Sequence, residues 1–215
     1  MKNFDTLLHV RGESIFIDDL PEWAELQHLA IVFSSVAHGT IKRFDVSKAA
    51  AAPGVTRVIT AADIPGENQI GGIFPDEPLL ADGSVHFVGD PLAIVVARTR
   101  EEAYAARRLV EVEIDPLPVV TDPRESFKNG TLIQPPRTFA LGDTDKAWAD
   151  CDLVIEGTAE NGGQEHFYLE TQIAVAVPQE NGEMKLISST QSPTVVQKAA
   201  ARVLGVPQHA VEVEL

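Results

Sequence analysis

The chain has 215 residues, of which 32 are acidic and 17 basic, so its formal net charge is −15. A surface this acidic repels phosphate backbones and anionic lipid, which argues against nucleic-acid binding. The 44% hydrophobic content supports a globular protein with a buried core. No apolar run approaches the roughly 18 residues of a membrane span, and the N-terminus shows no secretory segment. We therefore expect no membrane association and a cytoplasmic location.

Cys151 is the only cysteine of the chain. A single thiol forms no internal disulfide, cysteine-rich zinc site or iron–sulfur cluster, which also fits the cytoplasm. The flanking carboxylates of Asp150 and Asp152 disfavour the thiolate. We expect Cys151 to be a small packed side chain and not a nucleophile.

The first half of the chain alternates strand and helix signals. Apolar and β-branched runs predict strands over residues 29–36, 40–46, 55–60, 92–97 and 110–114. A short helix is expected over 47–52, before the breaker Pro53-Gly54. Thr99 and Glu102 have the spacing of a capping box at the start of a second helix. Its predicted packed face holds Ala103, Ala106, Leu109 and Val110.

Two stretches rich in glycine and proline interrupt this alternation. Residues 61–90 predict a long ordered loop, of a length that is often functional or interfacial. Residues 116–150 predict a linker that crosses the surface of the protein. Apolar side chains are spaced along that linker as expected anchors: Leu132, Ile133, Phe139, Leu141 and Trp148.

The last third predicts strands over 153–158, 172–177 and 183–189, followed by a helix and a final strand. Asn181-Gly182 lies between two apolar runs and indicates a hairpin. Ser192 is expected to cap the helix, with Pro193 in its first turn and Gly205 at its end. The chain stops inside the predicted strand 210–215, so we expect it to be a piece of a longer or split subunit.

Several segments, taken in order, resemble the molybdenum-binding subunit of the xanthine dehydrogenase and aldehyde oxidase family. In the first half they are residues 12–19 with 29–30, then 36–41, 53–55, 60–66, 76–81 and 85–91. In the second half they are Gly162–Glu170 and Ser189-Thr190-Gln191. Two residues depart from the family pattern: Gly39 stands where alanine is usual and Asp90 where glutamine is usual. Both departures concern local packing.

The resemblance implies an α+β fold, with an a/b hammerhead domain followed by the start of the molybdenum-cofactor-binding domain. We expect the hammerhead domain at residues 1–119, a linker at 120–150 and the truncated cofactor domain at 151–215.

The resemblance also implies the function. In this family a molybdenum ion held by a pterin hydroxylates purines, aldehydes or N-heterocycles with oxygen from water. The pterin occurs as such or in a dinucleotide form. Electrons leave through iron–sulfur clusters to a flavin, so an iron–sulfur subunit, an FAD subunit and the remainder of the molybdenum subunit are the expected partners in an oligomer. We expect this chain by itself to bind no cofactor and to be inactive.

By the same resemblance, Gln191 hydrogen-bonds an oxygen ligand of the molybdenum. Its place before a helix agrees, because the first N–H groups of a helix favour a polarised group nearby. Gly163 is expected to let the backbone approach the cofactor, with Gln164 and His166 as hydrogen-bonding neighbours. A purely structural role of this loop is the alternative. Glu165 and His166 are adjacent in sequence and would not face one point, so no metal ligand is assigned. The family's catalytic glutamate lies beyond Leu215, so no catalytic residue is assigned either.

Two other functions compete with this interpretation. A non-catalytic assembly module that keeps the hammerhead fold would explain the missing downstream site. A family member with another substrate, such as carbon monoxide, nicotinate or isoquinoline, is the second alternative. The form of residues 166–170 favours the purine and aldehyde branch.

Overall fold

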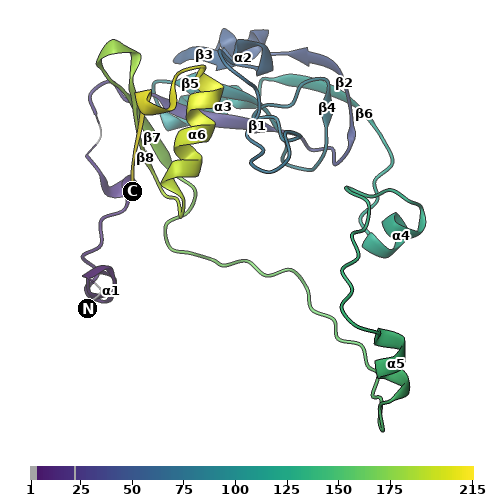
Figure 1. Cartoon of the computed structure of the whole chain (residues 1–215). Coiled ribbons are helices and arrows are strands. Elements are labelled where there is room, and N and C mark those ends of the chain that lie inside the picture. The colour runs from purple at the N-terminus through teal and green to yellow at the C-terminus, as the bar shows by residue number, and fades with distance from the viewer. Residues whose placement is uncertain (1–3, 22) are drawn as a thin grey trace. The chain divides into compact units, whose positions relative to one another are not determined.

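A computed structural model describes residues 4–21 and 23–215, and Figure 1 shows its helices and strands. The chain divides into two units: residues up to Val119 together with Leu169–Leu215 form the first, and Val120–Tyr168 form the second. The helices are α1 (Phe4–Arg11), α2 (Ser47–Ala50), α3 (Arg100–Arg107), α4 (Pro123–Lys128), α5 (Thr144–Ala149) and α6 (Pro193–Leu204). The strands are β1 (His28–Phe33), β2 (Gly39–Asp45), β3 (Val55–Ile59), β4 (Ser84–Val85), β5 (Pro91–Ala97), β6 (Glu111–Pro116), β7 (Ala174–Pro178), β8 (Met184–Ser188) and β9 (Val211–Glu214). Short 3-10 turns are η1 (Ile17–Asp19), η2 (Ala61–Asp63), η3 (Glu180–Gly182) and η4 (Gln208–Ala210).

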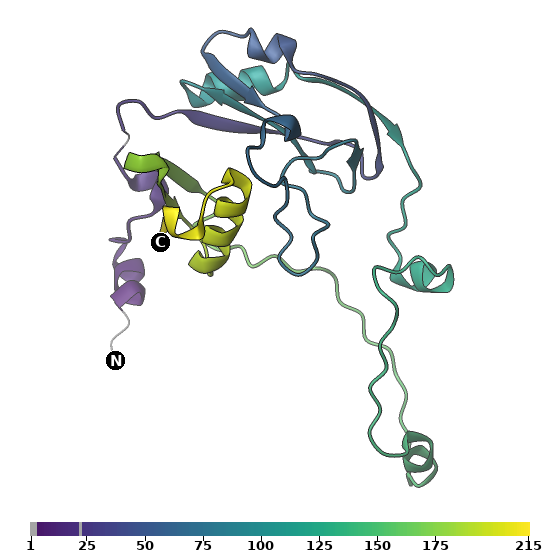
Figure 2. The ribbon, with the colours of Figure 1, turned by 45° about the horizontal axis from the view of Figure 1, so that its top comes forward.

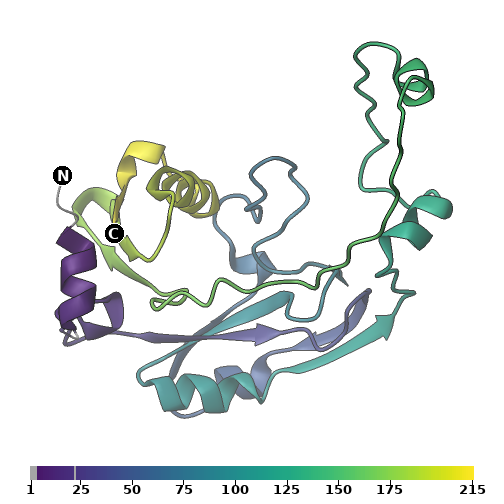
Figure 3. The ribbon, with the colours of Figure 1, turned by 90° about the horizontal axis from the view of Figure 1, so that it is seen from below.

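The first sheet has the order β1-β5-β3, with both pairs antiparallel. β5 is the central strand, and its continuous apolar run is largely buried, as predicted. α3 lies along one face of this sheet (Figure 3) and buries Ala103 and Ala106. Ala103 packs with Ala30 and Ala97 of the sheet, so small side chains bring helix and sheet close together.

The second sheet has the order β4-β2-β6 and explains the first departure from the family pattern. Gly39 pairs with Val85 on one side and Pro116 on the other. A Cβ at Gly39 would lie 2.5 Å from Ile114 Cγ2 and 2.6 Å from the carbonyl oxygen of Asp115. The alanine that is usual here would therefore collide with β6, and glycine fits this particular strand pair.

Asp90, the second departure, closes the turn that leads into β5. Its side chain is only 3% exposed, and its Oδ2 accepts a hydrogen bond of 2.9 Å from the backbone N–H of His86. Its carbonyl accepts from Ser34 N, and its own N–H donates to the carbonyl of Phe87. The short carboxylate thus accepts the hydrogen bond from the N–H of His86, and a longer glutamine side chain would have to fold back to reach the same N–H.

The third sheet has the order β7-β8-β9 (Figure 2), with β7 antiparallel and β9 parallel to β8. The predicted hairpin is confirmed: Asn181 and Gly182 both have positive φ, 58° and 79°, as a primed turn requires. α6 connects β8 to β9 and packs against β9. It ends where predicted, at Gly205, whose φ of 69° is left-handed.

The second unit contains two short helices that the sequence did not predict. Asp122 caps α4 by accepting from Arg124 N at 2.7 Å, and Asp143 caps α5 by accepting from Lys146 N at 2.9 Å. The expected anchors are exposed, Ile133 by 94%. They do not act as anchors within this chain because nothing that is described covers them.

Three further expectations were wrong. Residues 153–158 form no strand: the segment is exposed coil, because no described strand pairs with it and satisfies its N–H and C=O groups. Cys151 is exposed, since it follows the last turn of α5, where its thiol donates to the carbonyl of Ala147. Leu109 is also exposed, because α3 ends at Arg107 and the helical face does not reach it.

Candidate functional site

The segment Ser189-Thr190-Gln191 forms a fixed turn between β8 and α6. The N–H of Ser189 donates to the carbonyl of Ile173 at 3.1 Å, and its hydroxyl donates to the carbonyl of Thr171 at 2.8 Å. The same hydroxyl accepts from Ile173 N at 3.2 Å. Ser189 therefore holds the end of β8 against the residues that lead into β7.

Thr190 fixes the other side of the turn, because its hydroxyl accepts from the N–H of Ser192 at 3.0 Å. Gln191 lies between these two pinned residues, and its side chain is exposed. The turn thus presents the Gln191 amide to the outside directly before α6.

The N-terminus of α6 differs from the prediction in one respect. Ser192 is the N-cap residue as expected, but its side chain makes no capping hydrogen bond. Its ψ of 81° lies well short of the extended values at the caps of α3 and α4, 158° and 116°. The hydroxyl does not bond to the first turn of α6, in which Pro193 has no N–H and the N–H groups of Val195 and Val196 donate to the carbonyl of Ser192.

The segment Gly162–Glu170 runs without regular structure, and Gly163 and Gln164 are exposed in the second unit. A Cβ at Gly163 would meet no atom within 4 Å, and its φ is not in the positive region. Neither packing within this chain nor backbone conformation requires glycine here. Phe167 has a φ of 52° with its side chain 92% exposed, an unusual conformation for an aromatic residue.

The three residues expected to bind the cofactor belong to different units. Gln191 is in the first unit, and Gly163 and Gln164 are in the second.

Glu165 Oε1 accepts from the N–H of its neighbour His166 at 3.0 Å. Among the described residues, no group of three or more His, Cys, Asp and Glu side chains could hold a metal ion. Within the same residues, none of the helices has the length and apolar character to cross a membrane.

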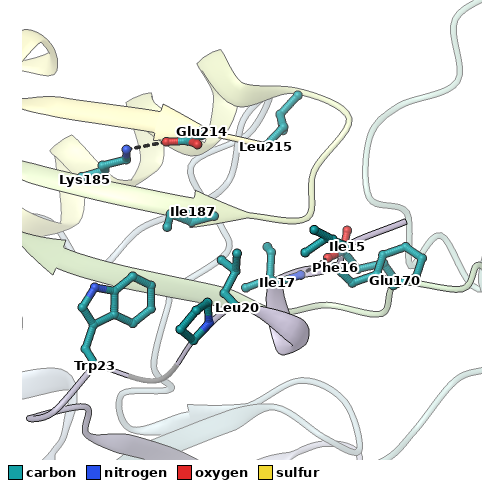
Figure 4. A pocket seen from close by; sticks show the side chains of 11 residues that line it. Ile15, Phe16, Ile17, Leu20, Trp23, Glu170, Lys185, Ile187, Glu214 and Leu215 are labelled. Carbon is teal, nitrogen blue, oxygen red and sulfur yellow. Dashed lines mark hydrogen bonds and ion pairs between the residues drawn. The ribbon is translucent and has the colours of Figure 1, made fainter. Parts of the chain in front are cut away.

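Glu170, at the end of the motif, has a structural role that the sequence did not reveal. Its Oε1 accepts from the N–H of Ile17 at 2.9 Å (Figure 4), across 153 positions of sequence. The bond lies at a half-open pocket of about 260 Å³. The pocket is lined by Ile15, Phe16, Ile17, Leu20, Pro21, Trp23, Glu170, Lys185, Ile187, Glu214 and Leu215. None of the three expected cofactor residues lines it.

A pair of opposite charges borders the same pocket. Lys185 of β8 and Glu214 of β9 form an ion pair between parallel neighbours (Figure 4). The hydrogen bond from Lys185 to Glu214, and then the negative charge of that carboxylate, raise the pKa of the lysine above its usual 10.5. The pair joins the edge strand β9 to β8, and we assign it a structural role.

Two family models match almost the whole chain. The aldehyde oxidase and xanthine dehydrogenase a/b hammerhead domain matches residues 11–118, and the molybdopterin cofactor-binding domain matches residues 127–215. The chain is 38% identical over 209 residues to a xanthine dehydrogenase/oxidase of Mus musculus and 40% identical over 202 residues to aldehyde oxidase 4 of the same species.

Solved structures agree with the sequence relatives. The aldehyde oxidoreductase of Desulfovibrio gigas superposes with a TM-score of 0.83 at 28% identity, over 96% of this chain and 25% of that one. The alignment with the mouse xanthine dehydrogenase/oxidase includes 97% of this chain but only 16% of that protein. The alignment with the aldehyde oxidase includes 93% of this chain and 15% of that protein. The chain belongs to the xanthine dehydrogenase and aldehyde oxidase family, of which it holds the hammerhead domain and the start of the molybdopterin-binding domain.

Proposed function

We propose that this chain is the N-terminal part of the molybdenum-binding subunit of a hydroxylase, and that Gln191 forms one wall of its cofactor site. The hammerhead domain would occupy residues 1–119, the linker 120–150 and the truncated cofactor domain 151–215. The observation that carries the proposal is the turn at 189–191. Hydrogen bonds hold both sides of it and leave the Gln191 amide exposed at the start of α6.

The residues present fit such a cofactor. The amide of Gln191 is neutral, so it donates to an oxygen-rich group without adding charge. The side chain of Ser192 does not cap α6, so the positive end of the helix dipole lies next to Gln191 without a capping side chain. Gly163 is compatible with the proposal, because a glycine lets another group approach its backbone closely and the space around its Cβ position is open.

When bound, the molybdenum–pterin group supplies the oxidative transfer of a water-derived oxygen to the substrate. The residues of this chain bind and orient that group through Gln191, Gly163 and Gln164, and the chain supplies no catalytic residue. The names of the relatives support purines such as xanthine, or aldehydes, as the substrate class, and N-heterocycles are proposed from the family resemblance alone. Iron–sulfur and FAD subunits or domains would accept the electrons in an oligomer, and the pterin would be bound as such or in a dinucleotide form.

The test uses the complete protein that contains this sequence. Molybdenum and pterin are quantified in the purified protein and in a Gln191→Ala variant, and oxidation of xanthine and of an aromatic aldehyde is followed with an electron acceptor. We expect about one molybdenum per subunit, turnover of one substrate class, and a loss in the variant of roughly a hundred- to a thousandfold in kcat, the range for removal of one donor from a polar catalytic site. Gln134→Ala, an exposed glutamine outside both segments, is the control. A complete protein without molybdenum would refute the proposal.

An assembly module is the second candidate function, and one observation favours it. The second unit exposes several large apolar side chains, among them Ile133, Phe139, Leu141, Ile155 and Phe167. If these side chains gather into one surface, it would be of the kind that binds other protein. If the complete protein bound its partner subunits but contained no molybdenum and oxidised no substrate, the assembly function would replace the hydroxylase function.

A further inference from the structure

A loop of the hammerhead domain caps the C-terminal end of α6. The N–H of Gly66 donates to the carbonyl of Val203 at 2.9 Å, and the N–H of Glu67 donates to the carbonyl of Arg202 at 3.0 Å. The last carbonyls of a helix have no partner within the helix. Here two of them are bonded by backbone N–H groups that lie more than 130 positions earlier in the sequence.

Glycine is needed at the centre of this contact. A Cβ at Gly66 would lie 2.1 Å from the carbonyl oxygen of Arg202 and 2.5 Å from the N of Gly205. Both of these are backbone atoms, so no rotamer change relieves the collision. Gly205 is the left-handed end of α6, and its own Cβ would lie 3.3 Å from the Cα of Gly66.

Arg202 bonds the loop a second time through its side chain. Its guanidinium Nη1 donates to the carbonyl of Gly71 at 3.3 Å, and its Nε lies 3.9 Å from the carboxylate of Glu67. Backbone and side chain of one residue thus hold the start and the end of the loop segment 66–71.

The loop segment 66–71 is itself anchored in the hammerhead core. The side chain of Asn68 donates to the carbonyl of Leu80 at 2.7 Å and accepts from the N–H of Leu80 at 2.9 Å. Leu80 is buried, and its neighbour Ala81 donates to the carbonyl of Pro91 at the start of β5. The loop therefore has a fixed position relative to the central strand of the first sheet.

Gln191 lies at the opposite end of the same helix. α6 has 12 residues and spans roughly 18 Å at 1.5 Å per residue. A helix held at its C-terminus by the loop and at its N-terminus by the turn at 189–191 has little freedom to slide or tilt. We infer that Gly66 and Arg202 are positioning residues for Gln191, and that the hammerhead domain sets the place of this cofactor-site wall through α6. The inference rests on the proposed role of Gln191.

The experiment compares variants of the complete, cofactor-loaded protein. Gly66→Ala introduces the backbone collision, and Arg202→Met removes the guanidinium but keeps the aliphatic stem, so it serves if the first variant fails to fold. The matched controls are Gly72→Ala, where a Cβ meets nothing within 4 Å, and Lys198→Met, an exposed cation of the same helix. Gln191→Ala is the reference.

Two measurements separate positioning from general stability: amide hydrogen exchange over residues 193–204 and the electron paramagnetic resonance signal of the molybdenum. We expect Gly66→Ala and Arg202→Met to speed the exchange by about two- to thirtyfold, the range of coupling through packed elements. We also expect both to shift the molybdenum signal in the direction that Gln191→Ala does, while the controls change neither.

Two other outcomes would overturn the inference. If Gln191→Ala shifts the molybdenum signal but the loop variants only lower the melting temperature, Gly66 and Arg202 are merely structural and the proposed function stands. If Gln191→Ala itself leaves molybdenum content and signal unchanged, the proposed role of Gln191 is wrong, and the inference fails with it.

Discussion

The carboxylate of Glu102 in α3 occupies the space that a side chain at Gly54 would need. A Cβ at Gly54 would lie 1.9 Å from Cδ of Glu102 and 2.0 Å from its Oε2. Gly54 also has a φ of 77° and accepts from the N–H of Arg98 at 3.1 Å. The turn before β3 and the first turns of α3 are therefore fitted to each other at this point.

Gly54→Ala is expected to destabilise the protein by two separate effects. The left-handed φ costs about 1–2 kcal/mol for any side chain, and the collision with Glu102 adds about 1–3 kcal/mol. Gly83→Ala is the matched control, because Gly83 has a φ of 74° but open space around its Cβ position. Urea unfolding measures both variants. Equal losses of stability would show that the carboxylate moves aside at no cost.

A second variant isolates the collision. Glu102→Ala shortens the side chain and gives up the ion pair with Arg98, a small loss because the Arg98 side chain is 69% exposed. In the Glu102→Ala background, Gly54→Ala should lower the free energy of unfolding only by the part due to the left-handed φ. The effects of the two substitutions on stability should therefore be non-additive. Additive losses would contradict the steric interpretation.

The local signals of the sequence predicted much of this fold, and the long-range ones did not. The apolar run of β5, the Asn181-Gly182 turn and the helix end at Gly205 each depend on a few neighbouring residues, so a short pattern contains them. The bond between Ile17 and Glu170 joins residues 153 positions apart, and no pattern in either segment indicates it. The wrongly predicted strand at 153–158 has strand-like residues but lacks a partner, which composition does not reveal.

The candidate site depended even more on information outside the local pattern. A Ser-Thr-Gln segment before a helix is by itself an ordinary strand end, and the family resemblance alone singled out Gln191. The structure adds how the turn is held, through the hydroxyls of Ser189 and Thr190. The loop cap at Gly66 could not be predicted, because its partners are backbone carbonyls, which any sequence offers.

Gly39→Ala restores the residue that is usual in the family, yet we expect it to destabilise this protein by about 1–3 kcal/mol. The added methyl would meet Ile114 Cγ2 and the carbonyl of Asp115. In an Ile114→Ala background the first collision is absent but the second remains, so Gly39→Ala should cost only part of what it costs in the parent background. Gly157→Ala, with nothing within 4 Å, serves as control, and thermal unfolding is the measurement. A Gly39→Ala protein as stable as the parent would show that β6 shifts freely.

Asp63 makes stability depend on pH at the acid end. Hydrogen bonds from the N–H and then the hydroxyl of Thr60, followed by one from Arg57, lower the pKa of this carboxyl below its usual 3.8. Because the folded pKa lies below the unfolded one, the contribution is present above 3.8 and is lost as pH falls through the folded value.

The pH dependence is tested with Asp63→Asn, which keeps an acceptor but cannot titrate. The urea midpoint of the parent should fall more steeply than that of the variant over the roughly two pH units below the usual pKa, from about pH 4 to about pH 2. Thr60→Val removes only the hydroxyl donor and should give an intermediate slope. Parallel curves for parent and Asp63→Asn would show that this carboxyl does not contribute.

Glu170→Ala is expected to release the N-terminal segment from the third sheet. The N–H of Ile17 would lose its acceptor while Ile17 is buried, which costs about 1–3 kcal/mol. Glu170→Gln keeps a carbonyl oxygen at the same position and should be nearly neutral. Amide exchange over residues 15–20 measures the release directly, and it should rise in the alanine variant only. If both variants exchange as the parent does, the packing of Leu20 and Trp23 at the pocket holds the segment without the hydrogen bond. A rise in both variants would instead show that the negative charge of Glu170, and not its acceptor oxygen, is what binds the Ile17 N–H.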